Sequence, residues 1–336
     1  MDYFLNIAGL IASLLILVWS ADIFVGGCVS LARRCGVSPL LIGMLIIGFG
    51  TSAPEMLVSL LSAMDGNPSI ALGNAFGSNI CNIGLILGLT AALCPISVAK
   101  GVLKREMPVL IGTTLFTWGL LLDRDISRMD AFLLLGVFLL VTLNNIWQEK
   151  RTTATAVQDD AAPAKVYSLG STIFRIVTGL AILVGSSRLL VVCAVKLARL
   201  LGVPDLIVGL TIVAIGTSLP ELASSLVAIR KREHDLALGN IIGSNLFNML
   251  AVIGIAGAVA PMTGKHDAGT IQMVLSRDFP VMFLMTVFLM ATCIPFKKGF
   301  PARINRSEGV LLFLAFAAYL TKLVLDAIDE SHALMS

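Results

Sequence analysis

The sequence predicts an all-α integral membrane protein of ten transmembrane helices, built as two inverted five-helix repeats. Three observations lead to this fold class: an extreme composition, a series of apolar stretches and an internal duplication. Of the 336 residues, 57% are hydrophobic and 13% are charged, and the mean hydropathy is +0.93. A soluble domain carries about 25% charged residues. This composition excludes a soluble, disordered or nucleic-acid-binding chain, so the lipid bilayer is the expected partner.

The apolar stretches define the expected helices, because a helix needs about 20 apolar residues to cross the hydrocarbon core. In lipid each backbone must satisfy its hydrogen bonds within its own segment, which requires helices. The ten stretches are residues 4–27, 37–64, 69–94, 107–122, 131–147, 169–195, 203–229, 236–260, 279–296 and 309–326. No basic segment precedes the first stretch, so a cleaved signal peptide is not expected.

The connections between these stretches predict the orientation. Alternate connections hold 16 of the 24 Lys and Arg residues, and the remaining connections hold six. Because basic connections face the cytoplasm, both termini are expected outside and the polar linker 148–168 inside. The linker is too short and too poor in apolar residues to form a domain. The compact chain without a transit peptide favours a prokaryotic cytoplasmic (inner) membrane.

The six cysteines and three histidines do not suggest catalysis or a resident metal. No C-x-x-C pair occurs, and all three histidines lie in polar connections. A disulfide framework or a zinc site is therefore not expected. Neither H-E-x-x-H nor G-x-S-x-G is present, so we expect no enzymatic activity, no cofactor and no obligatory protein partner.

An internal repeat divides the chain into two halves, residues 1–147 and 169–336. Residues 36–95 align with residues 202–261 without a gap, at a constant offset of 166, with 23 identities in 60 positions. The shared residues are mostly Gly, Ser, Thr, Asn, Pro and Glu, which are costly in a helix that faces lipid. Each half holds five spans, so the second half enters the membrane upside down. Inverted repeats are typical of secondary transporters with a substrate site near the midplane.

Two glutamates, Glu55 and Glu221, lie near the middle of repeated spans. An ionised carboxylate at this depth costs several kcal/mol unless a cation or a donor offsets it. The basic residues within spans, Arg188 and Lys322, are not duplicated. We therefore expect a transported cation to be the missing partner.

The neighbours of the glutamates supply further oxygen atoms. Thr51 and Ser52 precede Glu55 by four and three residues, which places them on the same helix face. The candidate ligands are Glu55, Glu221, Thr51, Thr217, Ser52, Ser218, Ser78, Ser244, Asn82 and Asn248. Oxygen ligands suit hard cations such as Na⁺ and Ca²⁺. The alternative is that the Ser, Thr and Asn side chains only join helices together.

Two prolines, Pro54 and Pro220, lie one residue before the glutamates. Each leaves the carbonyl four residues earlier without its helical donor. The freed carbonyls, and those of Gly48 and Ala214 one turn back, are candidates to face the ion. A kink that serves packing alone is the alternative. The glycine pairs Gly73/Gly77 and Gly239/Gly243 predict close helix approach.

Asp22 and Arg188 occupy equivalent positions in the first and sixth spans, 166 residues apart. We expect each to face water or a cavity rather than the ion. Pairing of these charges during gating is the alternative.

The motifs GTSAPE…GNAFGSNICN and GTSLPE…GNIIGSNLFN resemble the two alpha-repeats of the cation/calcium antiporter superfamily, most closely its prokaryotic sodium/calcium exchangers. The resemblance implies two long tilted helices, spans one and six, packed against an eight-helix core. It also implies that Glu55 and Glu221 are the central ligands. The threonines, serines and asparagines of the candidate set fall on the other ligand positions of the family.

The sequence departs from this family at Asn248, where many sodium/calcium exchangers have Asp. Both Asn82 and Asn248 are neutral, so the site has two carboxylates, which one Ca²⁺ or two Na⁺ would neutralise. Occluding an empty, doubly ionised site costs several kcal/mol, so only loaded or protonated states should switch sides. This rule produces exchange rather than leak, and protons are expected to compete with Ca²⁺.

The expected function is therefore secondary active antiport of Na⁺ for Ca²⁺ by alternating access at a midplane two-glutamate site. The first alternative is a proton/calcium or other divalent cation exchanger. A passive cation channel is a further alternative, which the lack of a repeated filter-like loop disfavours.

Overall fold

The structure is a computed structural model that describes residues 2–99, 101–153, 166–202, 208, 211–212, 214–294 and 302–335. Nearly all of these residues are helical. The first half contains α1 (Asp2–Cys35), α2 (Pro39–Ile42), η1 (Gly43–Gly48), α3 (Phe49–Thr51), α4 (Ala53–Met64), α5 (Ser69–Cys81), η2 (Asn82–Leu87), α6 (Gly88–Leu93), β1 (Ile96–Val98), η3 (Val102–Glu106), α7 (Met107–Leu121) and α8 (Arg128–Thr153). The η segments are π-helical turns within longer helices.

The second half repeats the order of the main helices, but its strand lies before the last helix. It contains α9 (Leu169–Leu200), α11 (Ala214–Thr217), α12 (Leu219–Arg230), α13 (His234–Leu246), η5 (Phe247–Val252), α14 (Ile253–Val259), α15 (Lys265–Met273), η6 (Val274–Asp278), α16 (Phe279–Thr292), β2 (Ala302–Ile304) and α17 (Arg306–Met335). Helices α4 and α12 begin and end 166 residues apart, as the sequence repeat predicts.

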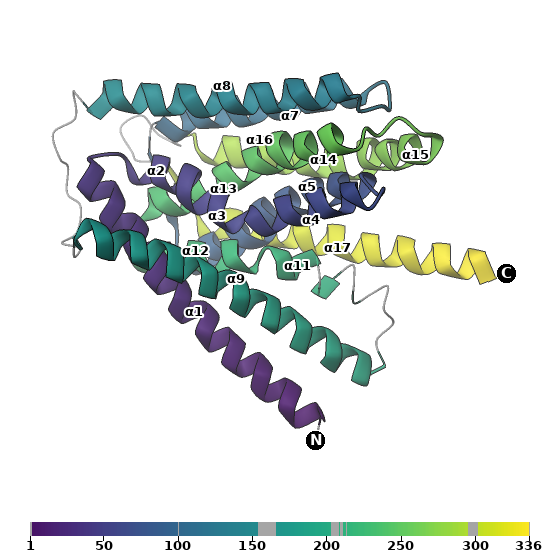
Figure 1. Cartoon of the computed structure of the whole chain (residues 1–336), viewed down its shortest axis with the longest axis horizontal. Coiled ribbons are helices and arrows are strands. Elements are labelled where there is room, and N and C mark those ends of the chain that lie inside the picture. Colours follow the sequence, from purple (N-terminus) through teal and green to yellow (C-terminus); the bar gives the residue numbers. More distant parts are fainter. Residues whose placement is uncertain are drawn as a thin grey trace.

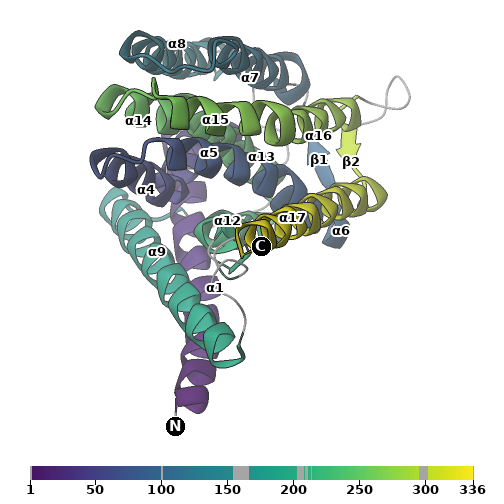
Figure 2. The same ribbon diagram turned by 90° about the vertical axis from the view of Figure 1, so that its right-hand side faces the viewer.

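The helices are stacked in layers (Figures 1 and 2). Helices α7 and α8 form one edge, followed by a layer of α14, α15 and α16. Helices α4, α5 and α13 lie next to that layer. At the opposite edge α1 and α9 pack along each other and extend beyond the rest of the molecule. The spans Ser69–Leu93 and His234–Val259 are therefore mostly buried, whereas α4 keeps exposed side chains such as Leu61 and Met64.

Seven described helices are long and apolar enough to cross a membrane. An eighth span results if the bent pair Pro39–Thr51 and Ala53–Met64 counts as one. The expected span 107–122 corresponds to η3 and α7, which together are helical from Val102 to Leu121. The expected span 203–229 lies partly outside the described residues, as does the linker 148–168. The count of ten spans, their inversion and the division at the linker stay predictions.

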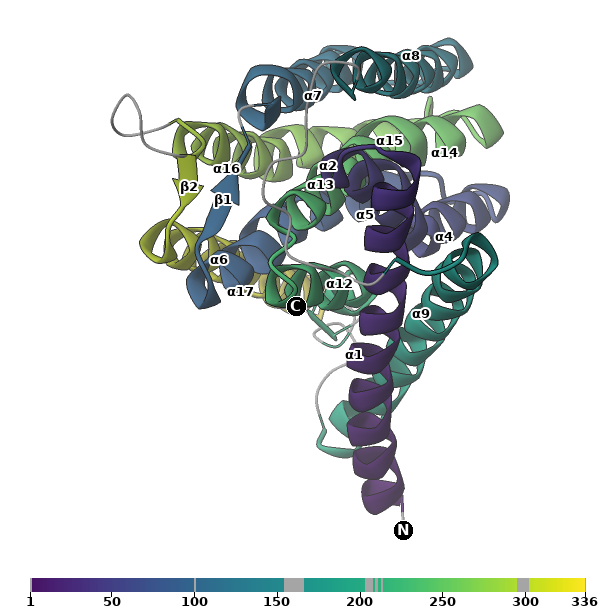
Figure 3. The same cartoon turned by 90° about the vertical axis from the view of Figure 1, so that its left-hand side faces the viewer.

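Two short pairings join the halves reciprocally. Strand β1 pairs with β2 in an antiparallel register that places Ile96 opposite Ile304 (Figure 3). A second bridge places Ile126 opposite Met262. Residues 96 and 262 are equivalent at the 166-residue offset, so each half supplies the same position to a partner in the other half.

Close backbone packing of η1 against α13 depends on glycines. A Cβ at Gly43 would meet the carbonyl oxygen of Leu236, and a Cβ at Gly243 would lie 2.5 Å from the carbonyl oxygen of Met44. Gly239 lies equally close to the backbone of α2 and η1. The predicted close approach at Gly239 and Gly243 is confirmed. No described atom lies within 4 Å of a Cβ at Gly73 or Gly77, and the segment equivalent to η1, residues 209–214, is mostly outside the described residues.

Candidate cation-binding site

Both glutamate-bearing helices are broken three residues before the glutamate. Ser52 separates α3 from α4, with φ −84° and ψ 0°, and Ser218 separates α11 from α12, with φ −92° and ψ 8°. Pro54 and Pro220 occupy the first turn that follows each break. Proline is well placed there because an N–H in the first turn of a helix has no helical acceptor. In the first half the two pieces are bent by 43°.

Glu55 and Glu221 lie in the first turns of α4 and α12, and each is 1% exposed. The helix dipole stabilises negative charge at this end of a helix. The Ser52 hydroxyl donates a hydrogen bond to Glu221 Oε1 at 3.3 Å. The two carboxylates are also close enough to interact electrostatically. The two halves of the chain therefore meet at the glutamates.

Several buried oxygens on the helices that carry the repeat have no hydrogen-bond partner among the described residues. They are Oε2 of Glu55 and Glu221, the hydroxyls of Ser218 and Ser244, and Oδ1 of Asn82 and Asn248. A buried polar group without a partner costs about 1–3 kcal/mol, and a charged group costs more. A hard cation takes six or more oxygen ligands. The donor set therefore fits a cation such as Na⁺ or Ca²⁺.

A crosswise set of amide hydrogen bonds orients Asn82 and Asn248. Asn82 Nδ2 donates to Asn245 Oδ1 at 3.0 Å, and Asn248 Nδ2 donates to Asn79 Oδ1 at 3.0 Å. Asn79 and Asn245 are equivalent positions of the repeat, as are Asn82 and Asn248. The two bonds are therefore the same contact, once with the donor in the first half and once with the donor in the second half. Because the amide nitrogens are engaged, the Oδ1 atoms of Asn82 and Asn248 remain available as ligands.

A second pair of asparagines ties each glutamate helix to the helix that follows it. Asn74 Nδ2 donates to the Glu55 carbonyl oxygen and to Ser59 Oγ, both at 3.1 Å. Asn240 Nδ2 donates to the Glu221 carbonyl oxygen at 3.3 Å and to Ser225 Oγ at 2.9 Å. These amides therefore position the glutamates through the backbone rather than as ligands.

The main-chain candidates are used differently in the two halves. The Gly48 carbonyl accepts the Ser52 N–H at 3.0 Å, so only its second lone pair is available. The Ser218 N–H instead bonds the Ile215 carbonyl at 3.1 Å, not that of Ala214, the first residue of α11. The Gly216 carbonyl, which Pro220 frees, accepts Ser187 Oγ from α9 at 3.1 Å.

The remaining candidates lie in the same helices. The Thr51 hydroxyl is 2.9 Å from the Ile47 carbonyl oxygen and 3.2 Å from Asn240 Oδ1. Ser78 is 5% exposed in α5, and Thr217, the last residue of α11, is partly buried. These side chains therefore lie on the helices that carry the repeat, and Thr51 contacts Asn240 of the other half.

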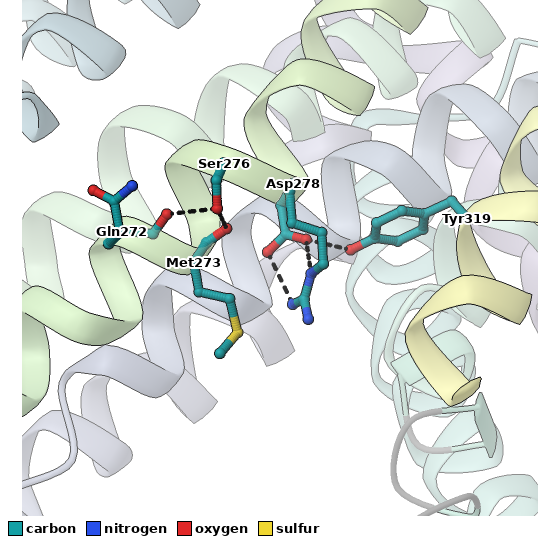
Figure 4. Close-up of polar contacts among 6 residues, drawn as sticks. Gln272, Met273, Ser276, Asp278 and Tyr319 are labelled. Atoms are coloured by element: carbon teal, nitrogen blue, oxygen red, sulfur yellow. Dashed lines mark hydrogen bonds and ion pairs between the residues drawn. The ribbon is translucent and has the colours of Figure 1, made fainter. Parts of the chain in front are cut away.

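Another buried acid, Asp278, shows how the protein neutralises a structural carboxylate (Figure 4). Arg277 Nε and Nη2 lie 2.7 Å and 3.2 Å from its two oxygens, and the Tyr319 hydroxyl donates to Oδ1 at 2.9 Å. Within the described residues neither Glu55 nor Glu221 forms an ion pair with Lys or Arg. Asp278 is therefore neutralised by the protein itself, whereas a bound cation would neutralise Glu55 and Glu221.

Comparison with known proteins identifies the family. The family described as "Sodium/calcium exchanger protein" matches residues 5–147 and 171–325. The chain belongs to the sodium/calcium exchanger family. It is 45% identical over 314 residues to the "Putative antiporter CaxA" of Alkalimonas amylolytica, an alignment that covers 92% of this chain and 95% of that protein.

This member of the sodium/calcium exchanger family is also similar to proteins of archaea. It is 29% identical to the "Sodium/calcium exchanger MaX1" of Methanosarcina acetivorans, over 95% of this chain and 98% of that protein. A solved structure of the sodium-calcium exchanger NCX_Mj matches with a TM-score of 0.78 and 29% identity, covering 96% of this chain and 99% of that chain. The family resemblance expected from the two motifs is confirmed.

Sequence reasoning missed several contacts of this exchanger-family site. The π-helical segments η1, η2 and η5 contain or adjoin Gly48, Asn82 and Asn248, and such turns are frequent at functional sites. Neither these turns nor the contact of Ser187 with the broken helix has a clear sequence signal. Asn79 and Asn245 did have a sequence signal, because the two asparagines occupy the same position in the two copies of the repeat.

Proposed function

We propose that the protein is a secondary active antiporter that exchanges Na⁺ for Ca²⁺ at a site formed by Glu55 and Glu221. The observation that carries this proposal is the meeting of two buried glutamates whose Oε2 atoms have no partner among the described residues. The unpaired oxygens of Ser218, Ser244, Asn82 and Asn248 complete an all-oxygen ligand set. Membership of the sodium/calcium exchanger family supports the choice of these two ions.

The transport cycle follows from charge. One Ca²⁺ or two Na⁺ neutralise the two carboxylates, whereas the unloaded, ionised site is costly to enclose away from water. The loaded site therefore switches sides and the ionised, unloaded site does not. This constraint couples the flux of one ion to the flux of the other.

We further propose that the two halves are inverted and exchange roles during alternating access. Contacts between connections support this arrangement. The Ile96–Ile304 pairing joins two connections that are both expected in the cytoplasm, and the Ile126–Met262 bridge joins two that are both expected outside. The Tyr3 hydroxyl, near the expected outer terminus, donates to the Leu200 carbonyl oxygen, which is also expected outside.

The experiment is calcium uptake by reconstituted protein. Vesicles loaded with Na⁺ are diluted into Na⁺-free medium, and the entry of radioactive calcium is measured. We expect Na⁺-dependent uptake by the wild type and a loss of at least about 100-fold in Glu55→Gln and Glu221→Gln, because removing one partner of a buried charge site costs about 3–5 kcal/mol. Asp123→Asn, which changes an exposed acid between α7 and α8, is the matched control and should retain uptake.

Full uptake by either glutamate variant would contradict the two-glutamate site. Uptake driven equally by a pH gradient in the absence of Na⁺ would instead favour the proton/calcium exchanger. Calcium flux that continues without any counter-ion would favour a passive channel.

A further inference from the structure

Two ion pairs join α1 to the turn that follows α12. Lys231 Nζ lies 3.0 Å from Asp22 Oδ1, and Arg33 Nη2 lies 3.4 Å from Glu233 Oε1. The side chains of Asp22 and Lys231 are 51% and 31% exposed. Because the pair is only partly buried by protein, it can open and close without a large desolvation cost.

The repeat relates this pair to a second pair of charges with reversed signs. At the 166-residue offset, Asp22 on α1 corresponds to Arg188 on α9, and Lys231 corresponds to Asp65 after α4. The long helix carries the acid in the first pair, Asp22, and the base in the second, Arg188. Each pair therefore combines an acid with a base and is attractive, although the two charges are exchanged between the halves.

The two turns that carry Asp65 and Lys231 have the same geometry. Asp65 has φ −80° and ψ 4°, and Lys231 has φ −81° and ψ 1°. The Asp65 N–H bonds the Leu61 carbonyl at 2.9 Å, and the Lys231 N–H bonds the Val227 carbonyl at 3.0 Å. Asp65 and Lys231 therefore have the same backbone conformation at the ends of the equivalent helices α4 and α12.

The second pair is open in this structure. Arg188 and Asp65 are both exposed, and neither forms an ion pair within the part of the chain that the structure describes. The structure therefore has one pair closed and its counterpart open. The connection at Lys231 is expected in the cytoplasm and that at Asp65 outside, so the two pairs belong to opposite faces.

We propose that Asp22–Lys231 and Arg188–Asp65 are reciprocal electrostatic latches, each closed in one of the two alternating conformations. This inference rests on the proposed exchange of roles between the halves. When the second half adopts the arrangement of the first, Arg188 reaches Asp65 and Asp22 leaves Lys231. In each conformation one latch is closed and the other is open, so one face of the protein is closed at a time.

The exposure of the first pair fits this role. A half-exposed ion pair shifts an equilibrium by roughly two- to fivefold rather than locking one state. Such a bias favours a closed face but lets a bound ion decide which conformation is populated. A deeply buried pair would hold one conformation too strongly for turnover.

Distances between spin labels in lipid nanodiscs test the proposal. Labels on Trp19→Cys and Arg230→Cys report the first latch, and labels at the equivalent positions Gly185→Cys and Met64→Cys report the second. The exposed native cysteines, Cys35 and Cys94, are replaced by serine in both proteins. We expect the two distances to be anticorrelated, so that any condition that lengthens one shortens the other.

Substitutions at the acids provide opposite predictions. Asp22→Asn should reduce the population with the short first distance by roughly two- to fivefold, and Asp65→Asn should increase it by a similar factor. The two changes remove partners of opposite states, whereas damage to folding would not shift one equilibrium in two directions. The double variant Asp22→Lys with Lys231→Asp should restore the wild-type populations.

Sodium-driven calcium uptake is measured in the same preparations to separate the two proposals. If wild-type uptake occurs but Asp22→Asn and Asp65→Asn leave both distances unchanged, or shift them in the same direction, the latches are wrong and the exchange function stands. If the wild type shows no Na⁺-driven uptake, the proposed function fails, and the two distances alone decide whether the latches are right.

Discussion

At the scale of residues, the site combines charge from two acids with geometry from amides. Glu55 and Glu221 supply negative charge in the first turn of a broken helix, where the dipole stabilises it. Asn79 and Asn245 hold the amide nitrogens of Asn248 and Asn82, so the carbonyl oxygens of these two ligands stay unpaired. Charge and orientation thus come from different residues.

Asn248 offers a direct test of the charge balance. Asn248→Asp adds a third carboxylate, so one Ca²⁺ leaves the loaded site with a net negative charge. Because enclosing uncompensated charge costs several kcal/mol, we expect Na⁺-driven calcium uptake to fall by at least about tenfold. Initial rates of radioactive calcium entry measure the effect.

The equivalent change on the other half, Asn82→Asp, is the matched comparison and should slow uptake as well. Uptake by Asn248→Asp at the wild-type rate would show that two carboxylates do not set the charge of the transported state.

The repeat made the central pair predictable but not the crosswise contacts. A buried Glu in each copy of GTS-x-PE indicated a shared ion, because no duplicated base was present to neutralise it. Asn79 and Asn245 occupy the same position of the repeat, but the alignment does not say which residue of the other half each one faces. Only the packing of α5 against the second half decides that Asn79 accepts a hydrogen bond from Asn248 Nδ2 and donates one to the Asn245 carbonyl oxygen.

At the scale of elements, the broken helix of the first half packs against α13 without side chains between their backbones. Helix α13 contacts η1 through Gly239 and Gly243, where added Cβ atoms would meet backbone. The prolines predicted the breaks at Ser52 and Ser218. The π-helical turns were not predictable, because no residue type specifies them and they depend on packing around the break.

Gly239→Ala tests this packing. Its methyl group would meet backbone atoms of α2 and η1, which cannot move aside as a flexible side chain can. Overpacking of this kind costs about 1–3 kcal/mol. We therefore expect a melting temperature several degrees below that of the wild type, measured by thermal unfolding in detergent, and slower calcium uptake.

Gly136→Ala in α8 is the control, since no described atom lies within 4 Å of its Cβ position. This variant should unfold at the wild-type temperature or slightly above it, because alanine favours helix. Equal stability losses in both variants would mean that the close approach is not the cause.

At the scale of the whole molecule, contacts between connections agree with the orientation expected from basic residues. The main-chain N–H of Ser38, at the start of the expected span 37–64, donates to Glu149 in the linker, and both ends are expected on the cytoplasmic side. The hydroxyl of Ser69 donates to Asp267, and both of these are expected outside. These contacts are consistent with the sides expected from the charge counts, which stay a prediction. The number of spans is harder to establish, because the apolar stretch 37–64 forms two helical pieces bent by 43°.

Cysteine labelling tests this orientation. Cys35 and Cys94 are exposed. Cys35 lies in a connection expected in the cytoplasm, and Cys94 ends the expected span 69–94 on that same side. A membrane-impermeant maleimide should therefore label both in inside-out vesicles and neither in right-side-out vesicles. Met64→Cys, introduced after both native cysteines are replaced by serine, should show the opposite pattern. Labelling of Cys35 from the outer face would contradict the expected topology.

The reversed charges at positions 22, 231, 188 and 65 carry a consequence for how such a molecule can be assembled. Two identical half-length chains arranged about a two-fold axis would place the same amino acids at both ends. Opposite polarities at the two ends require two copies with different sequences, as the two halves of this chain have. Divergence of the halves therefore permits the inner and outer closures to be tuned separately, which a homodimer of identical halves could not do.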